Sequence, residues 1–219
     1  MAASLRDMAA CIGITGTFSV VEHFFGYLSV PQDLSILNQV RRLQDRYVNM
    51  NLIRVGIEFF SAADELEIDR AVQNTRDTYA TVNLGVGRVR RYFITDADAN
   101  NHENIGSDGE AEDLTNEWTV DNRALDIFFV LTYSGDAIGL SRVDGPCDKD
   151  AKGMDGSVVA IETSLTGAVL AHEAGHYLGL DHSDDDNNLM FRSVPNGGNL
   201  TNNQGADMRD HCFVRSPCD

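Results

Sequence analysis

The stretch from His172 to His182, HEAGHYLGLDH, holds the residue types that metal-assisted hydrolysis needs. His172 and His176 are four positions apart, so on a helix they lie on one face and one turn apart, where both imidazoles can reach one ion. Glu173 stands at the edge of the same face, where its carboxylate can take a proton from water. The bare pattern H-E-x-x-H also arises by chance in unrelated helices, so it needs support from its surroundings.

That support comes from Gly179 and His182. Gly179 follows His176 by three residues, where a helix ends most easily at a residue that tolerates positive φ. The chain can then fold back and add His182 as a third ligand, leaving a fourth position open. Three neutral imidazoles with an open position suit Zn²⁺. We therefore predict His172, His176 and His182 as zinc ligands and Glu173 as the general base.

The elements around this stretch alternate between strand and helix. Residues 61–82 carry apolar side chains at helical spacing after a capping box of Ser61 and Asp64, and residues 124–133 are almost continuously apolar, as in a strand buried on both faces. Residues 96–112 are polar and predict a long surface loop. We predict strands over residues 51–60, 86–95, 124–133, 137–143 and 157–162, and helices over 33–48, 61–82, 165–178 and 201–212. The alternation indicates an α/β fold with a mostly parallel sheet.

The stretch from His172 to His182 resembles the extended zinc signature of the metzincin metallopeptidases, and Ser183 after the third histidine makes it most similar to the matrixin branch. Met190, eight residues beyond His182, resembles the structural methionine of the metzincin Met-turn. The likeness covers roughly residues 48–215. It implies an α+β metzincin variant of the α/β class: a mixed, mostly parallel twisted sheet with an antiparallel edge strand, an active-site helix, the Met-turn and a C-terminal helix. By this likeness, the edge strand at 137–143 holds extended substrate.

Two departures from the matrixin pattern bear on specificity and calcium. Phe191 and Arg192 follow Met190 where matrixins usually have Tyr-Pro, so the shape of the neighbouring substrate pocket does not carry over. The segments 96–100 and 148–153 resemble the beginnings of calcium loops but lack the glutamate at the twelfth position. Solvated turns explain them as well, and structural Ca²⁺ remains an open expectation because matrixins bind it near corresponding loops.

Cys11, Cys147, Cys212 and Cys218 contain no C-x-x-C pair, which argues against a structural zinc or redox motif. Four cysteines can pair in three ways, and four buried free thiols are the alternative. The resemblance to reprolysin-like relatives implies a bond from Cys147 to Cys212 or Cys218. We favour Cys218, because Cys212 shares a helical stripe with Met208 and is expected to be buried.

The composition limits the classes of molecule that the protein is expected to bind. Residues 1–219 carry 17 basic and 34 acidic side chains, a net charge of −17, which argues against nucleic acid or an anionic membrane as a partner. No apolar run reaches the roughly 20 residues of a membrane span. Residues 1–47 form an N-terminal segment of unclear role, expected to pack on the domain rather than to act as a targeting peptide. Residues 48–219 form the predicted catalytic domain.

Together these features predict a zinc-dependent endopeptidase, a monomer that acts on protein or peptide. The cysteines and the metzincin resemblance favour secretion, although no clear signal peptide is visible. Two alternatives remain. One is a metal-binding module without catalysis, which Glu173 argues against because such a site needs no base. The other is a highly selective processing protease or toxin that ignores generic substrates.

Overall fold

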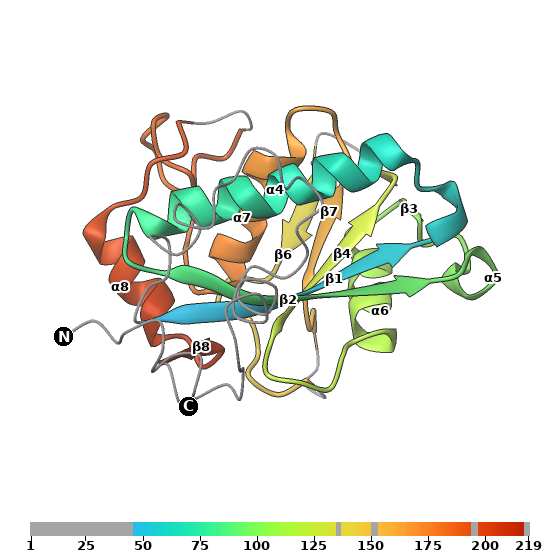
Figure 1. Ribbon diagram of the computed structural model, residues 1–219, viewed down its shortest axis with the longest axis horizontal. Helices are drawn as coiled ribbons and strands as arrows, with labels where there is room; N and C mark the ends of the chain where they lie inside the picture. The colour runs from blue at the N-terminus through green and yellow to red at the C-terminus, as the bar shows by residue number, and fades with distance from the viewer. Residues whose placement is uncertain (1–45, 135–136, 150–152, 194–196, 217–219) are drawn as a thin grey trace, which may run out of the picture.

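The computed structural model describes residues 46–134, 137–149, 153–193 and 197–216, which form a twisted sheet with helices on both faces (Figure 1). The strand order is β2-β1-β4-β7-β6, and β8 pairs with β1 outside this order. β1, β2, β4 and β7 are parallel, whereas β6 runs antiparallel to β7 at the edge. This confirms the predicted α/β class and the antiparallel edge strand. The bounds are β1 Tyr47–Val55, β2 Gly85–Ile94, β4 Leu125–Val130, β6 Gly139–Ser141, β7 Ser157–Ala160 and β8 Val214–Arg215.

β4 is the central strand, and all its residues are buried. Leu125, Ile127 and Phe129 belong to the core on one side of the sheet. Phe128 and Val130, which alternate with them, belong to the core on the other side. The nearly continuous apolar character of this segment therefore follows from burial on both faces, as predicted.

β1 begins earlier and ends earlier than the sequence pattern predicts. Tyr47 and Val48 already lie in the strand, so the helix predicted over 33–48 is wrong at its end; its residues 33–45 lie outside the described part. Val48, Met50 and Leu52 contribute to one core at a spacing of two, which overrides the helical spacing. The strand stops at Val55 because Gly56 takes the left-handed conformation, with φ 73°. Ile57–Phe59 then form a 3-10 helix, η1.

Three helices cover one face of the sheet with their apolar sides (Figure 1). They are α4 Ala62–Ala80, α7 Thr166–Tyr177 and α8 Asn202–Asp210. Capping boxes begin α4, as predicted, and also α8: the Ser61 hydroxyl accepts from the Asp64 amide, and the Thr201 hydroxyl accepts from the Gln204 amide. No helix in the described part of the chain is both long enough and apolar enough to cross a membrane.

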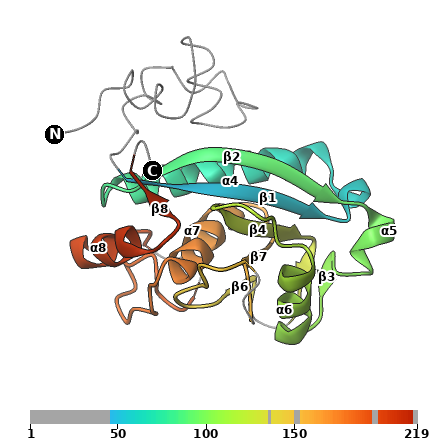
Figure 2. The ribbon, with the colours of Figure 1, turned by 90° about the horizontal axis from the view of Figure 1, so that it is seen from below.

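The opposite face of the sheet is covered by a helix that the sequence pattern does not predict. Residues 96–112 do not form one long loop but contain α5 Asp96–Ala99, β3 Asn104–Ile105 and the first half of α6 Asp108–Glu117. β3 pairs with β5 Thr132–Tyr133. Ala111 and Leu114 of α6 belong to the same core as Phe128 and Val130. The helix lies on the side of the sheet away from α4 (Figure 2). Two buried apolar side chains were too few to show a helical stripe among the acidic residues of this segment.

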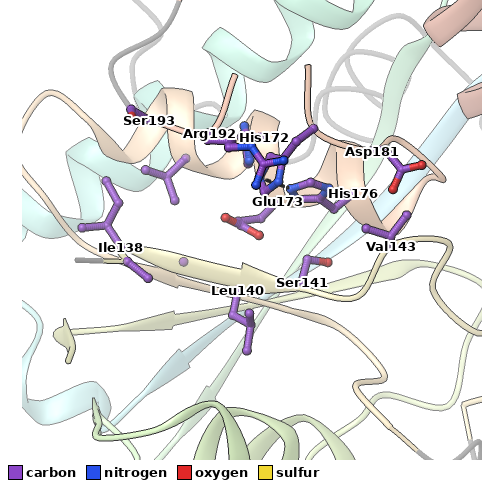
Figure 3. Close-up of a pocket in the computed structure, with 14 residues that line it drawn as sticks. Ile138, Leu140, Ser141, Val143, His172, Glu173, His176, Asp181, Arg192 and Ser193 are labelled. Atoms are coloured by element: carbon purple, nitrogen blue, oxygen red, sulfur yellow. Dashed lines mark hydrogen bonds between the residues drawn. The ribbon is translucent and has the colours of Figure 1, made fainter. Parts of the chain in front are cut away.

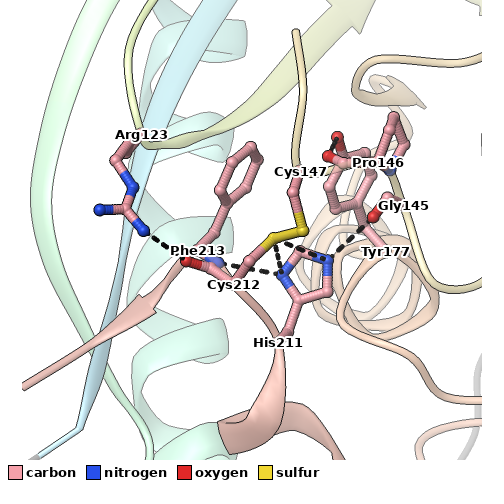
Figure 4. The surroundings of a disulfide bond; sticks show 8 residues. All are labelled: Arg123, Gly145, Pro146, Cys147, Tyr177, His211, Cys212 and Phe213. Atoms are coloured by element: carbon pink, nitrogen blue, oxygen red, sulfur yellow. Dashed lines mark hydrogen bonds between the residues drawn. A yellow bond between two sulfur atoms is a disulfide. The ribbon is translucent and has the colours of Figure 1, made fainter. Parts of the chain in front are cut away.

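The C-terminal segment is fixed by a disulfide between Cys147 and Cys212 (Figure 4). The preference for Cys218 is therefore wrong. α8 ends at Asp210 and His211 is extended, with ψ 141°, so Cys212 leaves the helical stripe of Met208 and reaches the loop after β6. Cys11 and Cys218 lie outside the described residues.

Candidate metal centre

α7 carries the first part of the site. His172, Glu173 and His176 are buried on this helix, which packs on the sheet and against α4. The helix ends at Leu178, and Gly179 adopts φ 99°. The Gly179 amide donates to the His176 carbonyl at 2.9 Å, and the Leu180 amide donates to the Gly175 carbonyl at 3.0 Å. This pair of bonds is the Schellman motif that ends a helix and reverses the chain.

The reversal brings His182 to the other two histidines, as predicted. One ring nitrogen from each of His172, His176 and His182 lies within 4.8 Å of the others. The Nε2 atoms of His176 and His182 are 3.2 Å apart. His172 and His176 are buried, whereas His182 is exposed at the opening of the site. Three nitrogen ligands therefore surround one small volume that is open on one side.

Backbone carbonyls orient two of the rings. His172 Nδ1 lies 2.8 Å from the Leu189 carbonyl oxygen, and His176 Nδ1 lies 2.6 Å from that of Leu180. A carbonyl can only accept, so each Nδ1 carries the proton and each Nε2 presents a lone pair to the shared volume. Burial lowers the pKa of His172, and it lowers that of His176 to about 4, which keeps both rings neutral. Converging neutral lone pairs fit Zn²⁺ as the occupant.

Met190, which the metzincin resemblance predicts as the Met-turn residue, packs against α7 at Gly175. Its side chain is fully buried. A Cβ atom on Gly175 would lie 2.9 Å from the Met190 sulfur, so the glycine between Glu173 and His176 allows this close packing. The Asn188 side chain accepts a hydrogen bond from the Met190 amide at 2.9 Å. The segment that supplies the Leu189 carbonyl to His172 is thus held under the site.

Glu173 is 8 % exposed and faces the same hollow as the histidines (Figure 3). Burial raises the pKa of its carboxyl to about 8. The edge strand β6 lies close to it, because a Cβ on Gly139 would lie 2.8 Å from Glu173 Cγ. The carboxylate therefore stands between the histidines and the edge strand.

A pocket of about 610 Å³ connects these groups to solvent. Its walls are β6, the helix α7 and the segment after Met190 (Figure 3). Two charged residues that were not predicted as site residues also line it, Asp181 and Arg192. Asp181 directly precedes the predicted ligand His182, and Arg192 lies two residues after Met190. Their nearness to the site could be read from the sequence, but an aspartate or arginine at these positions does not by itself indicate a function.

The sequence also contains other histidines and the calcium-like segments. His211 is buried; its Nε2 donates to the Gly145 carbonyl at 3.0 Å and its Nδ1 accepts from the Phe213 amide at 3.2 Å, consistent with a hydrogen-bonded structural residue. His23 lies outside the described part of the chain. From the calcium-like segment 148–153, Lys149 turns inward and pairs with Asp126 at 2.8 Å. Among described residues, Cys147, Cys212 and His211 also converge, but the disulfide occupies both thiols.

Comparisons with known proteins agree with this geometry. The model of a protein family described as metallo-peptidase family M12, reprolysin type, matches residues 46–215. A search of curated proteins found no match. Metalloproteinase-II from Bacteroides fragilis is a similar solved structure, with a TM-score of 0.54, 16% identity and 75% of this chain covered. This chain spans about half of that protein, 52%. Archaemetzincin from Methanopyrus kandleri has a TM-score of 0.51 and 14% identity, over 75% of this chain and 95% of its own.

Proposed function

The chain belongs to metallo-peptidase family M12, and on this premise we propose that it is a zinc-dependent endopeptidase with Glu173 as its general base. The observation that carries the proposal is the convergence of three histidine nitrogens beside a buried carboxylate. His172, His176 and His182 hold Zn²⁺ in this proposal, and the open side admits the substrate. Met190 supports the site from below.

The chain's own residues have separate tasks in this mechanism. When bound, Zn²⁺ supplies Lewis acidity that polarises the scissile carbonyl and makes water more acidic. Glu173 accepts a proton from water at its carboxylate and then donates it to the nitrogen of the leaving amine. The carbonyls of Leu189 and Leu180 hold two imidazoles in the ligating tautomer.

We also propose that β6 binds the substrate main chain. β6 is the last strand of the sheet order, with β7 on one side. Gly139, Leu140 and Ser141 of this strand line the pocket, so an extended peptide can pair with the free edge beside Glu173. Protein or peptide is therefore the expected substrate.

The finer classification and the cellular setting remain proposals. The likeness to the matrixin branch rests on the motif, Ser183 after His182 above all. The Cys147–Cys212 bond supports a secreted or otherwise oxidising location. We retain residues 48–219 as the catalytic domain, residues 1–47 as a segment packed on it, and a monomer as the acting form. Structural Ca²⁺ stays a prediction.

Two variants test the assignment of roles. Glu173→Ala removes the base but no ligand, so we expect it to retain zinc and lose about 10²- to 10⁴-fold in peptidase activity. His176→Ala removes a ligand, so we expect it to lose zinc as well. The measurements are zinc content by elemental analysis and digestion of casein or gelatin with and without a chelator. Full activity in Glu173→Ala would refute the role of that residue.

The same digest separates the two alternatives. A metal-binding module without catalysis would hold zinc and cut nothing. A highly selective processing protease would also leave casein intact, but at high concentration it should cut its own chain or one particular partner. The buried position of Glu173, close to the histidines, favours catalysis, because a module that only binds metal needs no carboxylate there.

A further inference from the structure

We propose that Arg192 is a specificity-determining residue that binds a carboxylate of the substrate close to the scissile bond. This inference rests on the proposed endopeptidase function and names the substrate class of that site. The carboxylate has two sources, an aspartate or glutamate side chain or the C-terminal carboxylate of a short peptide. Both present the same planar pair of oxygens to a guanidinium.

The backbone fixes the position of Arg192. Met190 and Phe191 run beside the chain of the third histidine: the Ser183 amide donates to the Met190 carbonyl at 2.8 Å, and Phe191 forms a bridge with Ser183. The Phe191 amide also donates to the Asn188 carbonyl at 3.1 Å. Arg192 is the next residue, so its Cα stands where this anchored segment reaches the rim of the pocket.

The side chain of Arg192 reaches from that rim toward the histidines (Figure 3). His172, His176 and His182 line the same pocket as Arg192. Arg192 is exposed to solvent, as a residue that meets an incoming ligand must be. A group bound to it would therefore lie beside the position where the peptide bond is cut.

Arg192 also differs in charge from the other residues that line the pocket. Among the fourteen described residues that line the pocket, it is the one permanent cation, beside the acidic Glu173 and Asp181. Within the described ranges, no acidic side chain forms an ion pair with it, although other arginines do so: Arg54 and Arg91 both pair with Glu65. Its fork of donors is available to a ligand, and a carboxylate is the group that fits it with two parallel hydrogen bonds.

The test uses matched fluorogenic peptides and the zinc-loaded full chain. Each peptide carries aspartate or glutamate at one position on either side of the cut, and its partner carries asparagine or glutamine there. Each pair is made with a free and an amidated C-terminus. We expect the wild type to prefer the carboxylate peptides by about tenfold in kcat/KM, the usual gain from a charge-assisted pair.

Three variants locate this preference. Arg192→Gln should abolish it, and Arg192→Glu should reverse it in favour of lysine or arginine peptides, with zinc content unchanged in both. Arg70→Gln is the matched control, because it makes the same change of charge on the surface of α4, where the Arg70 side chain is 61% exposed. Its preference should equal that of the wild type. A preference that needs the free C-terminus identifies the terminal carboxylate, and one that persists in amidated peptides identifies an acidic side chain.

A binding measurement separates this inference from the proposed function. Labelled carboxylate and amide peptides are titrated against zinc-loaded Glu173→Gln, with and without Arg192→Gln, by fluorescence anisotropy. Cleavage without carboxylate preference, or with a preference that Arg192→Gln leaves intact, overturns the inference and spares the peptidase. Binding that depends on Arg192 without any cleavage by the wild type supports the inference and overturns the peptidase. Neither binding nor cleavage overturns both.

Discussion

At the scale of single residues, Gly179 decides whether the third histidine joins the site. Its φ of 99° lies in the region that side chains other than glycine avoid. Space around it is open, because a Cβ at this position would meet nothing within 4 Å. Any cost of substitution must therefore come from the backbone conformation and not from a clash.

This difference makes Gly179→Ala a specific test of the chain reversal. We expect the substitution to cost about 1 kcal/mol of stability and to weaken zinc binding several-fold, because the strained turn no longer holds His182 beside His172. Gly179→Asn should lose less, since asparagine tolerates the left-handed region better. Competition with a chromogenic chelator and urea unfolding measure the two effects. Equal zinc affinity in Gly179→Ala and wild type would contradict the role of the glycine.

The predicted site residues could be found from side-chain spacing, whereas the missed ones depend on features of the folded chain. His172, His176 and His182 were predictable because helical spacing and a glycine fix where imidazoles lie. The carbonyls that orient two of these rings belong to Leu180 and Leu189, and a backbone group leaves no mark in the sequence. Arg192 was visible only as a departure from a familiar motif, since its proximity to the site depends on folding of the segment after Met190.

At the scale of elements, the site depends on how closely the edge strand approaches the active-site helix. β6 meets α7 at Gly139, where a Cβ would lie 2.8 Å from Glu173 Cγ, 2.8 Å from Val169 Cγ1 and 3.0 Å from the Val158 carbonyl oxygen. The last of these is backbone of the neighbouring strand and cannot rotate away. The strand must therefore have glycine here if it is to stay both paired with β7 and in contact with the helix.

Gly139→Ala should consequently move either β6 or the Glu173 side chain. We expect kcat/KM to fall at least about tenfold while zinc content stays the same, because a small displacement of a catalytic group is enough to impair it. Gly109→Ala in α6 is the matched control: a Cβ there would meet only Ser107 Oγ at 3.8 Å. Unimpaired peptidase activity in Gly139→Ala would show that the approach of the strand to Glu173 is irrelevant.

Helices were predicted correctly where the apolar pattern extended over many residues, and they were missed where it was short. α4 was recognisable from its capping box and from Ile68, Val72 and Tyr79, all of which are buried. α6 starts with Ser107 as its N-cap but buries only Ala111, Leu114 and Thr115 among acidic residues. Its helical form depends on packing against the second face of the sheet. The sequence alone does not reveal that contact.

At the scale of the whole molecule, the loop after β6 joins three distant parts of the chain. The Asp144 and Gly145 amides donate to the His176 and Tyr177 carbonyls at 3.0 and 2.9 Å, which satisfies the end of the active-site helix. His211 donates to the Gly145 carbonyl from the C-terminal segment. β8 follows that segment and pairs with the beginning of β1 (Figure 2). The edge strand, the active-site helix and the end of the fold are thus held by one loop.

The disulfide between Cys147 and Cys212 is the covalent part of this connection, and the two cysteines have a sequence separation of 65. Cys212→Ser should lower the free energy of unfolding by about 3 kcal/mol, because the unfolded chain regains the freedom that the bond removes. Denaturant unfolding under non-reducing conditions measures the loss, and reductant should bring the wild type to the same stability. Cys218→Ser is the control, since Cys218 is the partner that the sequence pattern favoured. Were Cys218→Ser to lose this stability and Cys212→Ser to keep it, the bond would have to run to Cys218, and the C-terminal segment would be held differently.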